Sequence, residues 1–311
     1  MTSHVEDIAQ ALQAMGRNAV VLGESLLPGV PTIQRVDALA LINEGSPVTW
    51  HAHRPHSLKE GLKLRKKWPH LRVIWTHHNW KAPSWPTRRL LQKADAVISL
   101  TQEGADQLDM ESTVIGHGVD LNRFQPVSKT PTFRVGIIGR IRPDKGHDAV
   151  VKAFNALGNE RDDWGLSFFG EVRPQHRGFA KKLHAQCPDK MSICSFSTDR
   201  VEMYRQLDVV VMASPAEGYS LVIPEALAMG LPVLSTPLPH FERLLKHGEN
   251  ILFFSPGTPD SLAQELEALL GKESARHTLG QHARQAAETH FSIEEEGRLL
   301  CEVYDRELSN R

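Results

Sequence analysis

The stretch "LDVVVMASPAEGYSLVIPEALAMGLPVLST" (residues 207–236) predicts a strand, a loop, a helix and a second strand. The apolar runs at its two ends are rich in Val and Leu without polar alternation, which is typical of strands buried on both faces of a parallel sheet. Pro224 fits only the first turn of the helix between them. Because ligands of such sheets bind beyond the carboxyl ends of the strands, the loop after Ser214 is a candidate site.

The same alternation of strands and helices runs along the whole chain. Similar apolar runs occur at 18–22, 48–52, 71–76, 95–100, 133–139, 166–170, 192–196 and 251–254. Between them, segments such as "HDAVVKAFNAL" (147–157) space apolar residues at helical intervals. Together these patterns predict an α/β protein with doubly wound parallel sheets.

The chain has 311 residues, which suggests two domains rather than one. The segment 118–133 is polar, contains proline and lacks periodicity, as linkers do. We therefore expect an N-terminal Rossmann-like domain at 1–125 and a C-terminal Rossmann-like domain at 126–290, followed by a final helix at 291–311.

The composition argues against several classes of protein. The formal net charge is −1, so the chain has no global bias toward nucleic acid. No apolar run approaches the length of a membrane span, and no basic-then-apolar signal peptide opens the sequence. The three cysteines are odd in number and lack the spacing of zinc ligands, so we expect reduced thiols in a cytoplasmic protein.

Two carboxylates, Glu217 and Glu225, flank the turn that leads into the helix of the opening stretch. Gly218 permits close approach of a ligand, and Ser220 can cap the helix. Free N–H groups at a helix start attract phosphate, while carboxylates accept hydroxyl hydrogens, so Glu225 suits a ribose and Glu217 a second polyol. The alternative is a solvated loop acid and an ordinary glutamate on a helix surface.

A second motif, "VGIIGRIRPDKGH" (135–147), ends an apolar strand at Gly139 and adds Arg140 and Lys145 before a helix. Arg can bind a diphosphate through two parallel hydrogen bonds and Lys adds a point charge, so the pair can stabilise a departing diphosphate without a metal. A Gly-x-Gly-x-x-Gly fingerprint is absent from the sequence, which disfavours a dehydrogenase, and a Walker loop is absent too. In isolation, the motif also fits a surface turn with two solvated cations.

In this order, the two motifs resemble those of retaining glycosyltransferases of family 4, as do the segments "IGHGVDLNRFQP" (115–126) and "FSIEEEGRLLCEVYDREL" (291–308). The resemblance implies the GT-B fold, in which two Rossmann-like domains face each other, and a last helix that packs back toward the first domain. Within the family, the mannosyltransferases of lipopolysaccharide core assembly are the most similar, because they carry a stretch like the Trp-His-Ala at 50–52.

The resemblance also assigns roles to residues of the two motifs. It implies that Arg140 and Lys145, which follow Gly139, bind the diphosphate of the nucleotide-sugar donor. Many members have glycine at the last position of the turn between the two acids, where this chain has Ser220.

The two acids form an E-x7-E pair in the family's pattern. The resemblance implies that the first, Glu217, contacts the donor sugar and is a catalytic residue, and that the second, Glu225, binds the ribose. In the family, amides of the intervening turn touch sugar or phosphate, so the resemblance adds Gly218, Tyr219 and Ser220 to the expected donor-binding residues.

The N-terminal half matches the family less well. His77 aligns with a histidine near the donor sugar, which makes it a catalytic candidate, and His53 aligns with a loop histidine on the acceptor side. His51 and His53 alternate along a strand and share one face, but no acidic or cysteine partner stands at ligand spacing. We therefore expect no metal, a structural zinc included, and no cofactor besides the nucleotide-sugar co-substrate.

The segment "LKEGLKLRKKWPHLR" (58–72) concentrates basic residues with Leu58, Leu62 and Trp68 interleaved. Such a helix suits an anionic membrane surface or a lipid-linked acceptor, which would make the protein peripheral at the inner face of the cytoplasmic membrane. The alternative is a solvated helix face with a packed apolar stripe.

Family members begin with a strand and a glycine-containing loop before a helix like that predicted at 2–15. This chain resembles them only from the end of that loop onward. We therefore expect an N-terminal domain that lacks its first strand and glycine loop, either because the start is misassigned or because the strand was lost.

The expected function is transfer of a hexose, with retention of anomeric configuration, to a hydroxyl of a glycan or lipid-linked acceptor such as lipopolysaccharide core. GDP-mannose is the first choice of donor, by resemblance. The alternatives are a UDP-sugar donor and a non-catalytic protein that binds sugar nucleotides on the same fold. No nucleic-acid partner is expected.

Overall fold

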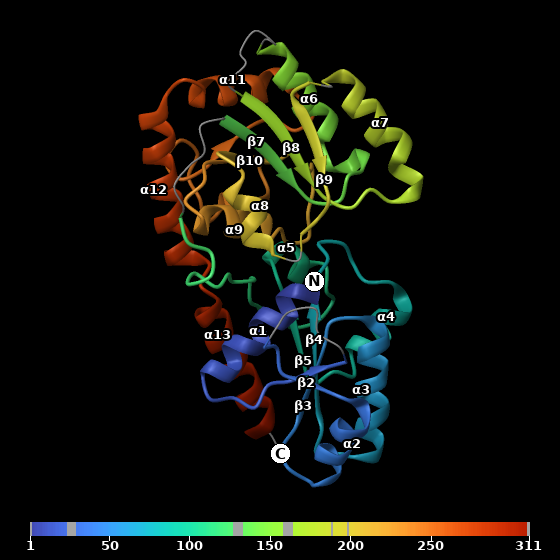
Figure 1. The fold of residues 1–311 in the computed structure, drawn as a ribbon. Helices are drawn as coiled ribbons and strands as arrows, with labels where there is room; N and C mark the ends of the chain where they lie inside the picture. The colour runs from blue at the N-terminus through green and yellow to red at the C-terminus, as the bar shows by residue number, and fades with distance from the viewer. Residues whose placement is uncertain are drawn as a thin grey trace. The chain divides into compact units, whose positions relative to one another are not determined.

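The computed structural model describes residues 2–23, 29–126, 133–157, 164–187, 189–197 and 199–309. The chain divides into two compact units, one formed by residues 1–120 with 291–311 and the other by residues 121–290. Each unit is built around a parallel sheet with helices packed on it, as Figure 1 shows. The two units are described separately below.

The first unit has a four-stranded parallel sheet in the order β3-β4-β5-β6 and a separate parallel pair, β1-β2. Its strands are β1 (Val21–Leu22), β2 (Thr32–Ile33), β3 (Thr49–Ala52), β4 (Arg72–His77), β5 (Ala96–Ser99) and β6 (Thr113–Val114). Its helices are α1 (Thr2–Ala14), α2 (Arg35–Asn43), α3 (Pro55–Lys67), α4 (Trp85–Leu91), α5 (Gln102–Asp106) and α13 (Ile293–Ser309).

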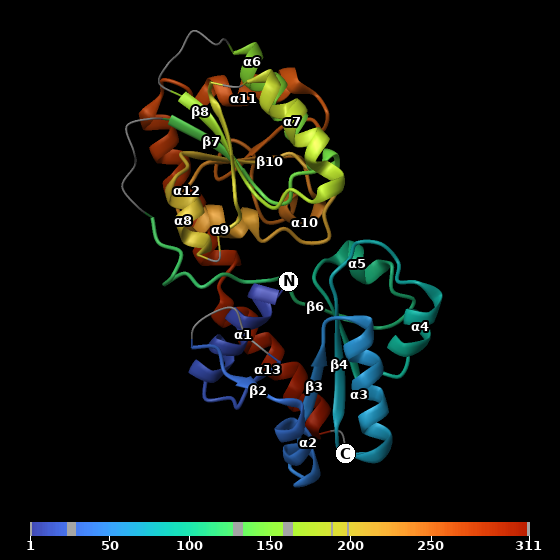
Figure 2. The same ribbon diagram turned by 45° about the vertical axis from the view of Figure 1, so that its right-hand side comes forward.

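Alternate residues of β4 point to opposite faces of this sheet. On one face, Val73 packs with Leu58 of α3 in one apolar cluster. On the other face, Ile74 joins Ile8 of α1 and Leu300 of α13 in a second cluster. The last helix of the chain is therefore part of the core of the first unit, where Figure 2 shows it beside α1.

The second unit has a six-stranded parallel sheet in the order β12-β11-β10-β7-β8-β9. Its strands are β7 (Phe133–Ile138), β8 (Trp164–Phe169), β9 (Met191–Cys194), β10 (Val209–Met212), β11 (Val233–Ser235) and β12 (Leu252–Phe253). Its helices are η1 (Pro143–Lys145), α6 (His147–Ala156), η2 (Pro174–His176), α7 (Arg177–Gln186), α8 (Arg200–Arg205), α9 (Val222–Ala228), α10 (Pro239–Glu242), α11 (Pro259–Leu269) and α12 (Glu273–His290), where η marks a single 3₁₀ turn.

The strand order of the second unit is that of a Rossmann fold. Counted along the chain within this unit, the strands lie in the order 3-2-1-4-5-6. The order reverses between β7 and β10, which are neighbours with Val135 opposite Val209. In sheets of this kind the ligand crevice opens at this switch point, beyond the carboxyl ends of the two strands.

Every strand expected from the sequence is present, with bounds that differ by a few residues. Two strands were missed, β2 and β6, and each has only two residues, too few for an apolar run to stand out. The expected linker at 118–133 includes residues 127–132, which lie outside the described residues.

Apolar packing in the second unit depends on large buried side chains. Phe154 of α6 is fully buried and stacks on Trp164 of β8, with the ring centroids 3.8 Å apart. We expect Phe154→Ala to lower the free energy of unfolding by about 3–5 kcal/mol, because it leaves a cavity that the sheet cannot fill. Phe196, which is 52% exposed, is the matched control. Phe196→Ala should change the free energy of unfolding by about 0.5 kcal/mol or less. Denaturant titration followed by circular dichroism measures both, and equal losses would contradict this account of the core.

Candidate active site

The candidate site lies where the sheet order of the second unit reverses. β7 runs into Gly139, whose φ of 150° suits glycine, and its N–H donates to the carbonyl of Phe169 at 2.9 Å. A Cβ on the neighbouring Gly170 would lie 1.9 Å from the carbonyl oxygen of Gly139, so the two glycines allow the chain to pass closely here. Arg140 follows directly and is exposed to solvent at this edge of the sheet.

A second glycine fixes the start of α6 against the end of β10. Gly146 has a φ of 71°, and a Cβ on it would lie 2.4 Å from the carbonyl oxygen of Ala213. Only glycine fits this approach without a shift of backbone. Lys145, at the end of η1, is thereby held next to the loop that follows β10.

Lys145 and Glu217 form an ion pair across the switch point. The Nζ of Lys145 donates to Oε1 of Glu217, and both side chains are partly buried, with 19% and 16% of their surface exposed. The two motifs that the sequence analysis singled out thus meet, one from the strand before the reversal and one from the strand after it. A cation and a carboxylate at this crevice offer contacts to a phosphate and to sugar hydroxyls.

Glu225 has other partners. It lies in the first turn of α9, is 3% exposed, and pairs through Oε1 with the guanidinium of Arg200. The hydroxyl of Tyr204 donates to Oε2 of Glu225 at 2.6 Å. Burial raises the pKa of Tyr204 well above its usual value, so this hydroxyl stays protonated and remains a donor.

Arg200 and Tyr204, which come from α8, were missed by the sequence analysis. They lie 25 and 21 residues before Glu225, and their helix carried no motif that linked them to it. Both oxygens of Glu225 are therefore engaged within the protein. Sugar binding by this residue, as the resemblance implies, would require a ribose to share the carboxylate with these partners.

The turn between the two acids is partly buried. The ring of Tyr219 stacks on His240 with centroids 5.2 Å apart and also contacts Phe241. Gly218 is half-buried and Ser220 is 6% exposed. The expectation that Ser220 caps the helix was wrong, because α9 starts one residue later, after Leu221, whose side chain makes no cap. Pro224 does lie in the first turn, as predicted.

The two candidate histidines lie in the first unit. His77 ends β4, is 3% exposed, and donates from Nε2 to the carbonyl of Lys81 at 3.1 Å. Burial lowers the pKa of His77. His53 is half-buried in a group of histidines, with its Nδ1 3.0 Å from Nε2 of His78, and burial lowers its pKa well below the usual value.

Comparison with known proteins decides the family. Residues 119–286, slightly more than half of the chain, match the family of glycosyl transferases group 1. The chain belongs to this family. It is therefore a glycosyltransferase of group 1, and the matched segment spans Arg140, Lys145, Glu217 and Glu225.

Two curated relatives of this glycosyltransferase match along almost the whole chain. The lipopolysaccharide core biosynthesis mannosyltransferase LpsB of Rhizobium meliloti is 28% identical over 327 residues, covering 98% of this chain and 93% of that protein. The lipopolysaccharide core biosynthesis mannosyltransferase LpcC of Rhizobium leguminosarum is 25% identical over 330 residues, covering 100% and 94%. The similarity to core mannosyltransferases, first inferred from short motifs, is thus confirmed.

Solved structures support the fold of the glycosyltransferase. The crystal structure of Anabaena HepE in complex with UDP superimposes with a TM-score of 0.80 at 18% identity, covering 97% of this chain and 96% of that chain. The GT-B fold class predicted from the sequence is therefore confirmed. Among the described residues, no helix is both long and apolar enough to span a bilayer.

The contacts of the two acids predict different effects of the same substitution. Glu225→Gln should lower the free energy of unfolding by about 3–5 kcal/mol, because it removes a carboxylate charge from beside a buried guanidinium. Glu217→Gln should cost about 1 kcal/mol or less, since its pair with Lys145 is partly open to solvent. Denaturant titration without any ligand measures both variants. Similar small losses would show that the contact of Glu225 with Arg200 contributes little to folding.

Proposed function

We propose that the chain is a retaining hexosyltransferase of family 4. It moves mannose from GDP-mannose to a hydroxyl of a glycan or lipid-linked acceptor such as lipopolysaccharide core, and the transfer step needs no metal. Membership of glycosyl transferases group 1 supports the reaction class. The relatives named as lipopolysaccharide core mannosyltransferases support the choice of sugar and acceptor. The observation that carries the proposal is the pairing of Lys145 with Glu217 at the switch point.

Breaking this ion pair can couple donor binding to a change at Glu217. Without a ligand, Lys145 and Glu217 neutralise each other. A diphosphate that binds between Arg140 and Lys145 competes for the ammonium group, because it carries more charge than one carboxylate. The carboxylate of Glu217 is then released to accept hydrogen bonds from sugar hydroxyls. Donor binding and sugar orientation are coupled through one contact.

In the proposed transfer, the bond between the anomeric carbon and the diphosphate oxygen breaks and a bond to the acceptor oxygen forms on the same face. The acceptor hydroxyl gives its proton to the departing diphosphate. Arg140 and Lys145 stabilise the negative charge that develops on the leaving group. Glu217 orients the sugar through its hydroxyls, and His77 is the candidate residue of the first unit, with His53 on the acceptor side.

A UDP-sugar donor is the second candidate. The HepE structure with a similar fold was determined in complex with UDP, which shows what that protein binds. The contacts of Arg140 and Lys145 with a diphosphate would be the same for either nucleotide, because the phosphates are shared. Binding measurements with GDP-sugars and UDP-sugars therefore decide which nucleotide base the protein accepts.

Transfer assays on the purified chain test the proposal. With radiolabelled GDP-mannose and a truncated core lipid, Lys145→Ala should lower the rate about 10²–10³-fold, because one fixed charge at the leaving group is lost. Glu217→Gln should lower the rate while GDP binding, measured by calorimetry, is retained. Lys152→Ala is the matched control, since Lys152 is exposed on α6 and pairs only loosely with Asp148 at 3.9 Å.

The outcomes separate the candidates. Transfer from UDP-glucose but not from GDP-mannose would show that the proposed donor is wrong and would leave the proposed mechanism unchanged. Binding of nucleotide sugars without transfer or hydrolysis would favour the non-catalytic alternative. An unchanged rate for Lys145→Ala would remove the diphosphate role and with it the proposed site.

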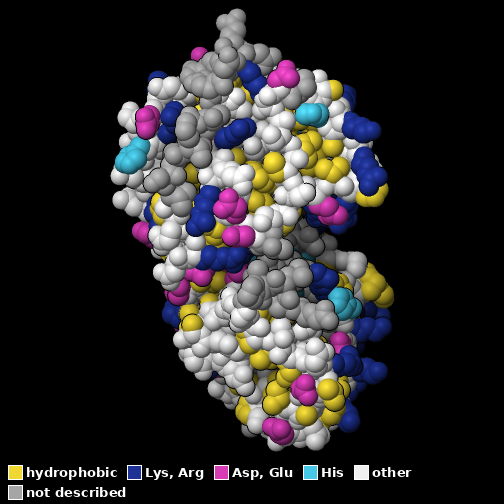
Figure 3. Space-filling model, in the orientation of Figure 1, with side chains coloured by type: hydrophobic (Ala, Val, Ile, Leu, Met, Phe, Trp, Pro, Cys, Tyr) yellow, Lys and Arg dark blue, Asp and Glu magenta, His cyan; other side chains and the backbone are white. Residues whose placement is uncertain are grey.

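We also propose a peripheral contact between α3 and an anionic membrane surface at the inner face of the cytoplasmic membrane. Leu58, Leu62 and Leu64 of α3 are buried in the first unit, so the apolar stripe is not available to a bilayer. The opposite face exposes a row of lysines: Lys59, Lys63, Lys66 and Lys67. Figure 3 shows Lys and Arg side chains gathered on the side where α3 lies. The proposed contact is therefore electrostatic, without insertion.

Vesicle sedimentation tests this contact. Lys63→Glu, Lys66→Glu and Lys67→Glu together should weaken co-sedimentation with phosphatidylglycerol vesicles, because each basic residue near an anionic surface contributes about 1 kcal/mol. The matched control reverses Lys152, Lys181 and Lys182 of the second unit, which changes the net charge by the same amount. Equal losses in the two triple variants would point to net charge alone and contradict a role for α3.

A further inference from the structure

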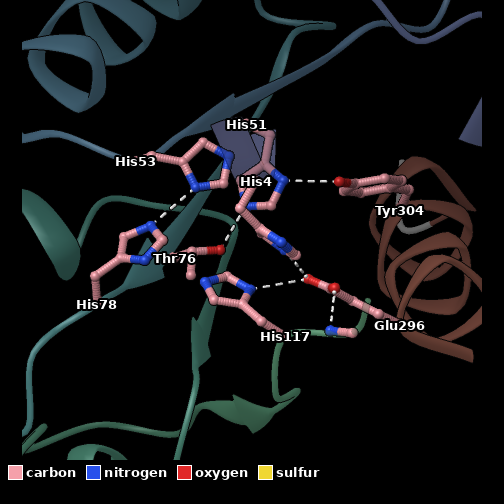
Figure 4. A network of polar contacts seen from close by, with 9 residues as sticks. His4, His51, His53, Thr76, His78, His117, Glu296 and Tyr304 are labelled. Atoms are coloured by element: carbon pink, nitrogen blue, oxygen red, sulfur yellow. Dashed lines mark hydrogen bonds and ion pairs between the residues drawn. The ribbon is translucent and has the colours of Figure 1, made fainter. Parts of the chain in front are cut away.

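A buried polar cluster in the first unit takes no part in the donor site described above. Its centre consists of His4 in the first turn of α1, His117 in the segment after β6, and Glu296 in the first turn of α13. Their exposed fractions are 2%, 6% and 6%. Figure 4 shows the three side chains pointing toward one another from three separate segments of the chain.

The nitrogen and oxygen atoms of these residues converge. Nε2 of His4 lies 2.9 Å from Oε1 of Glu296, and Nδ1 of His117 lies 3.1 Å from the same oxygen. One atom from each residue lies within 4.8 Å of the others. A tetrahedral ion with bonds of about 2.0–2.1 Å separates its ligand atoms by about 3.3 Å, so the two nitrogen–oxygen distances need to lengthen by only a few tenths of an ångström.

The carboxylate is held in place by backbone. Its other oxygen, Oε2, accepts the N–H of Gly118 at 2.7 Å. A Cβ on Gly118 would lie 2.4 Å from the carbonyl oxygen of Ser292, so glycine lets this segment pack directly on the start of α13. Two backbone hydrogen bonds fix the same approach: the N–H of Val119 donates to the carbonyl of Phe291 at 2.7 Å, and the N–H of Ile293 donates to the carbonyl of Val119 at 3.1 Å. Metal-binding carboxylates are usually oriented by a second contact of this kind.

The site also has the chemistry that a metal requires. Imidazole nitrogens and a carboxylate oxygen are donor atoms that Zn²⁺ prefers, and the three residues offer both kinds at one point. Glu296 is a buried carboxylate, and a buried negative charge is costly unless a cation balances it. A small cavity of about 10 Å³, the space of a single water molecule, borders the three residues and is lined by apolar side chains together with His51, His53 and Thr76.

We infer that His4, His117 and Glu296 bind a divalent transition-metal cation, with Zn²⁺ as the first candidate, and that the open position of the ion faces the cavity. Two histidines and one carboxylate are a known zinc ligand set. The ion would join residues 292 positions apart in the chain and so tie α1 to α13. All three ligands belong to the first unit, and their convergence does not depend on the proposed function.

This inference departs from the expectation of no structural zinc. That expectation rested on His51 and His53, for which no acidic partner stood at ligand spacing. The partner that the structure supplies for the cluster, Glu296, comes from the other end of the chain. The short contacts would also occur in a network of hydrogen bonds in which a proton balances the carboxylate, and the experiment distinguishes the two.

Metal analysis of the full chain, expressed without a histidine tag, provides the test. Inductively coupled plasma mass spectrometry should find about one zinc per chain, as expected when three buried ligands form a site. A chelator should lower the midpoint of thermal unfolding, and added Zn²⁺ should restore it. His117→Gln and Glu296→Gln should each reduce bound zinc to near zero, whereas His56→Gln, which changes an exposed histidine of the same unit, should keep it.

Cobalt substitution covers the case in which a variant is destabilised. The wild-type chain loaded with Co²⁺ should show the visible absorption of a four-coordinate site, and His117→Gln should lose it while its far-ultraviolet circular dichroism is unchanged. If the folded wild-type chain binds neither Zn²⁺ nor Co²⁺ at micromolar free ion, and chelator leaves the unfolding midpoint unchanged, the cluster is a hydrogen-bonded network and the inference is wrong.

Discussion

The second unit depends on one close approach, that of Gly146 to Ala213. The strand order brings β7 and β10 together, but the side chains that follow them meet only because the backbone at the start of α6 can touch the end of β10. A larger residue at that point would push η1 away and separate Lys145 from Glu217. The pairing of cation and acid is thus a result of backbone packing rather than of attraction between two mobile side chains.

Two buried carboxylates show how the protein compensates charge away from water. The negative charge of Glu225 is neutralised by the guanidinium of Arg200, and its second oxygen accepts a hydrogen bond from the hydroxyl of Tyr204. Glu296 is surrounded by histidines and a backbone N–H, none of which carries a permanent charge. The first arrangement is complete by itself, whereas the second needs a proton or a metal ion to become neutral. This difference is why only the second suggests an additional ligand.

Much of the fold could be predicted from the sequence, because continuous Val- and Leu-rich runs mark the strands of a sheet covered on both faces. The approach of Lys145 and Glu217 could be predicted, because each lies beside a glycine in a short motif that follows a strand. The partners of Glu225 could not, since Arg200 and Tyr204 precede it by more than twenty residues on a helix without a recognisable pattern. Contacts such as that of His4 with Glu296 join residues from distant parts of the chain. Motifs defined by short sequence spacing cannot predict such contacts.

The return of α13 to the first unit has a consequence for how the protein is made. Residues 121–290 form a continuous segment and can fold as soon as they leave the ribosome. The core that contains Ile8 and Ile74 must wait for Leu300, which is synthesised after the whole of the second unit. During translation, the face of the first sheet that α13 covers therefore remains open until the second unit has been synthesised, and a polypeptide truncated before α13 would leave that apolar face exposed.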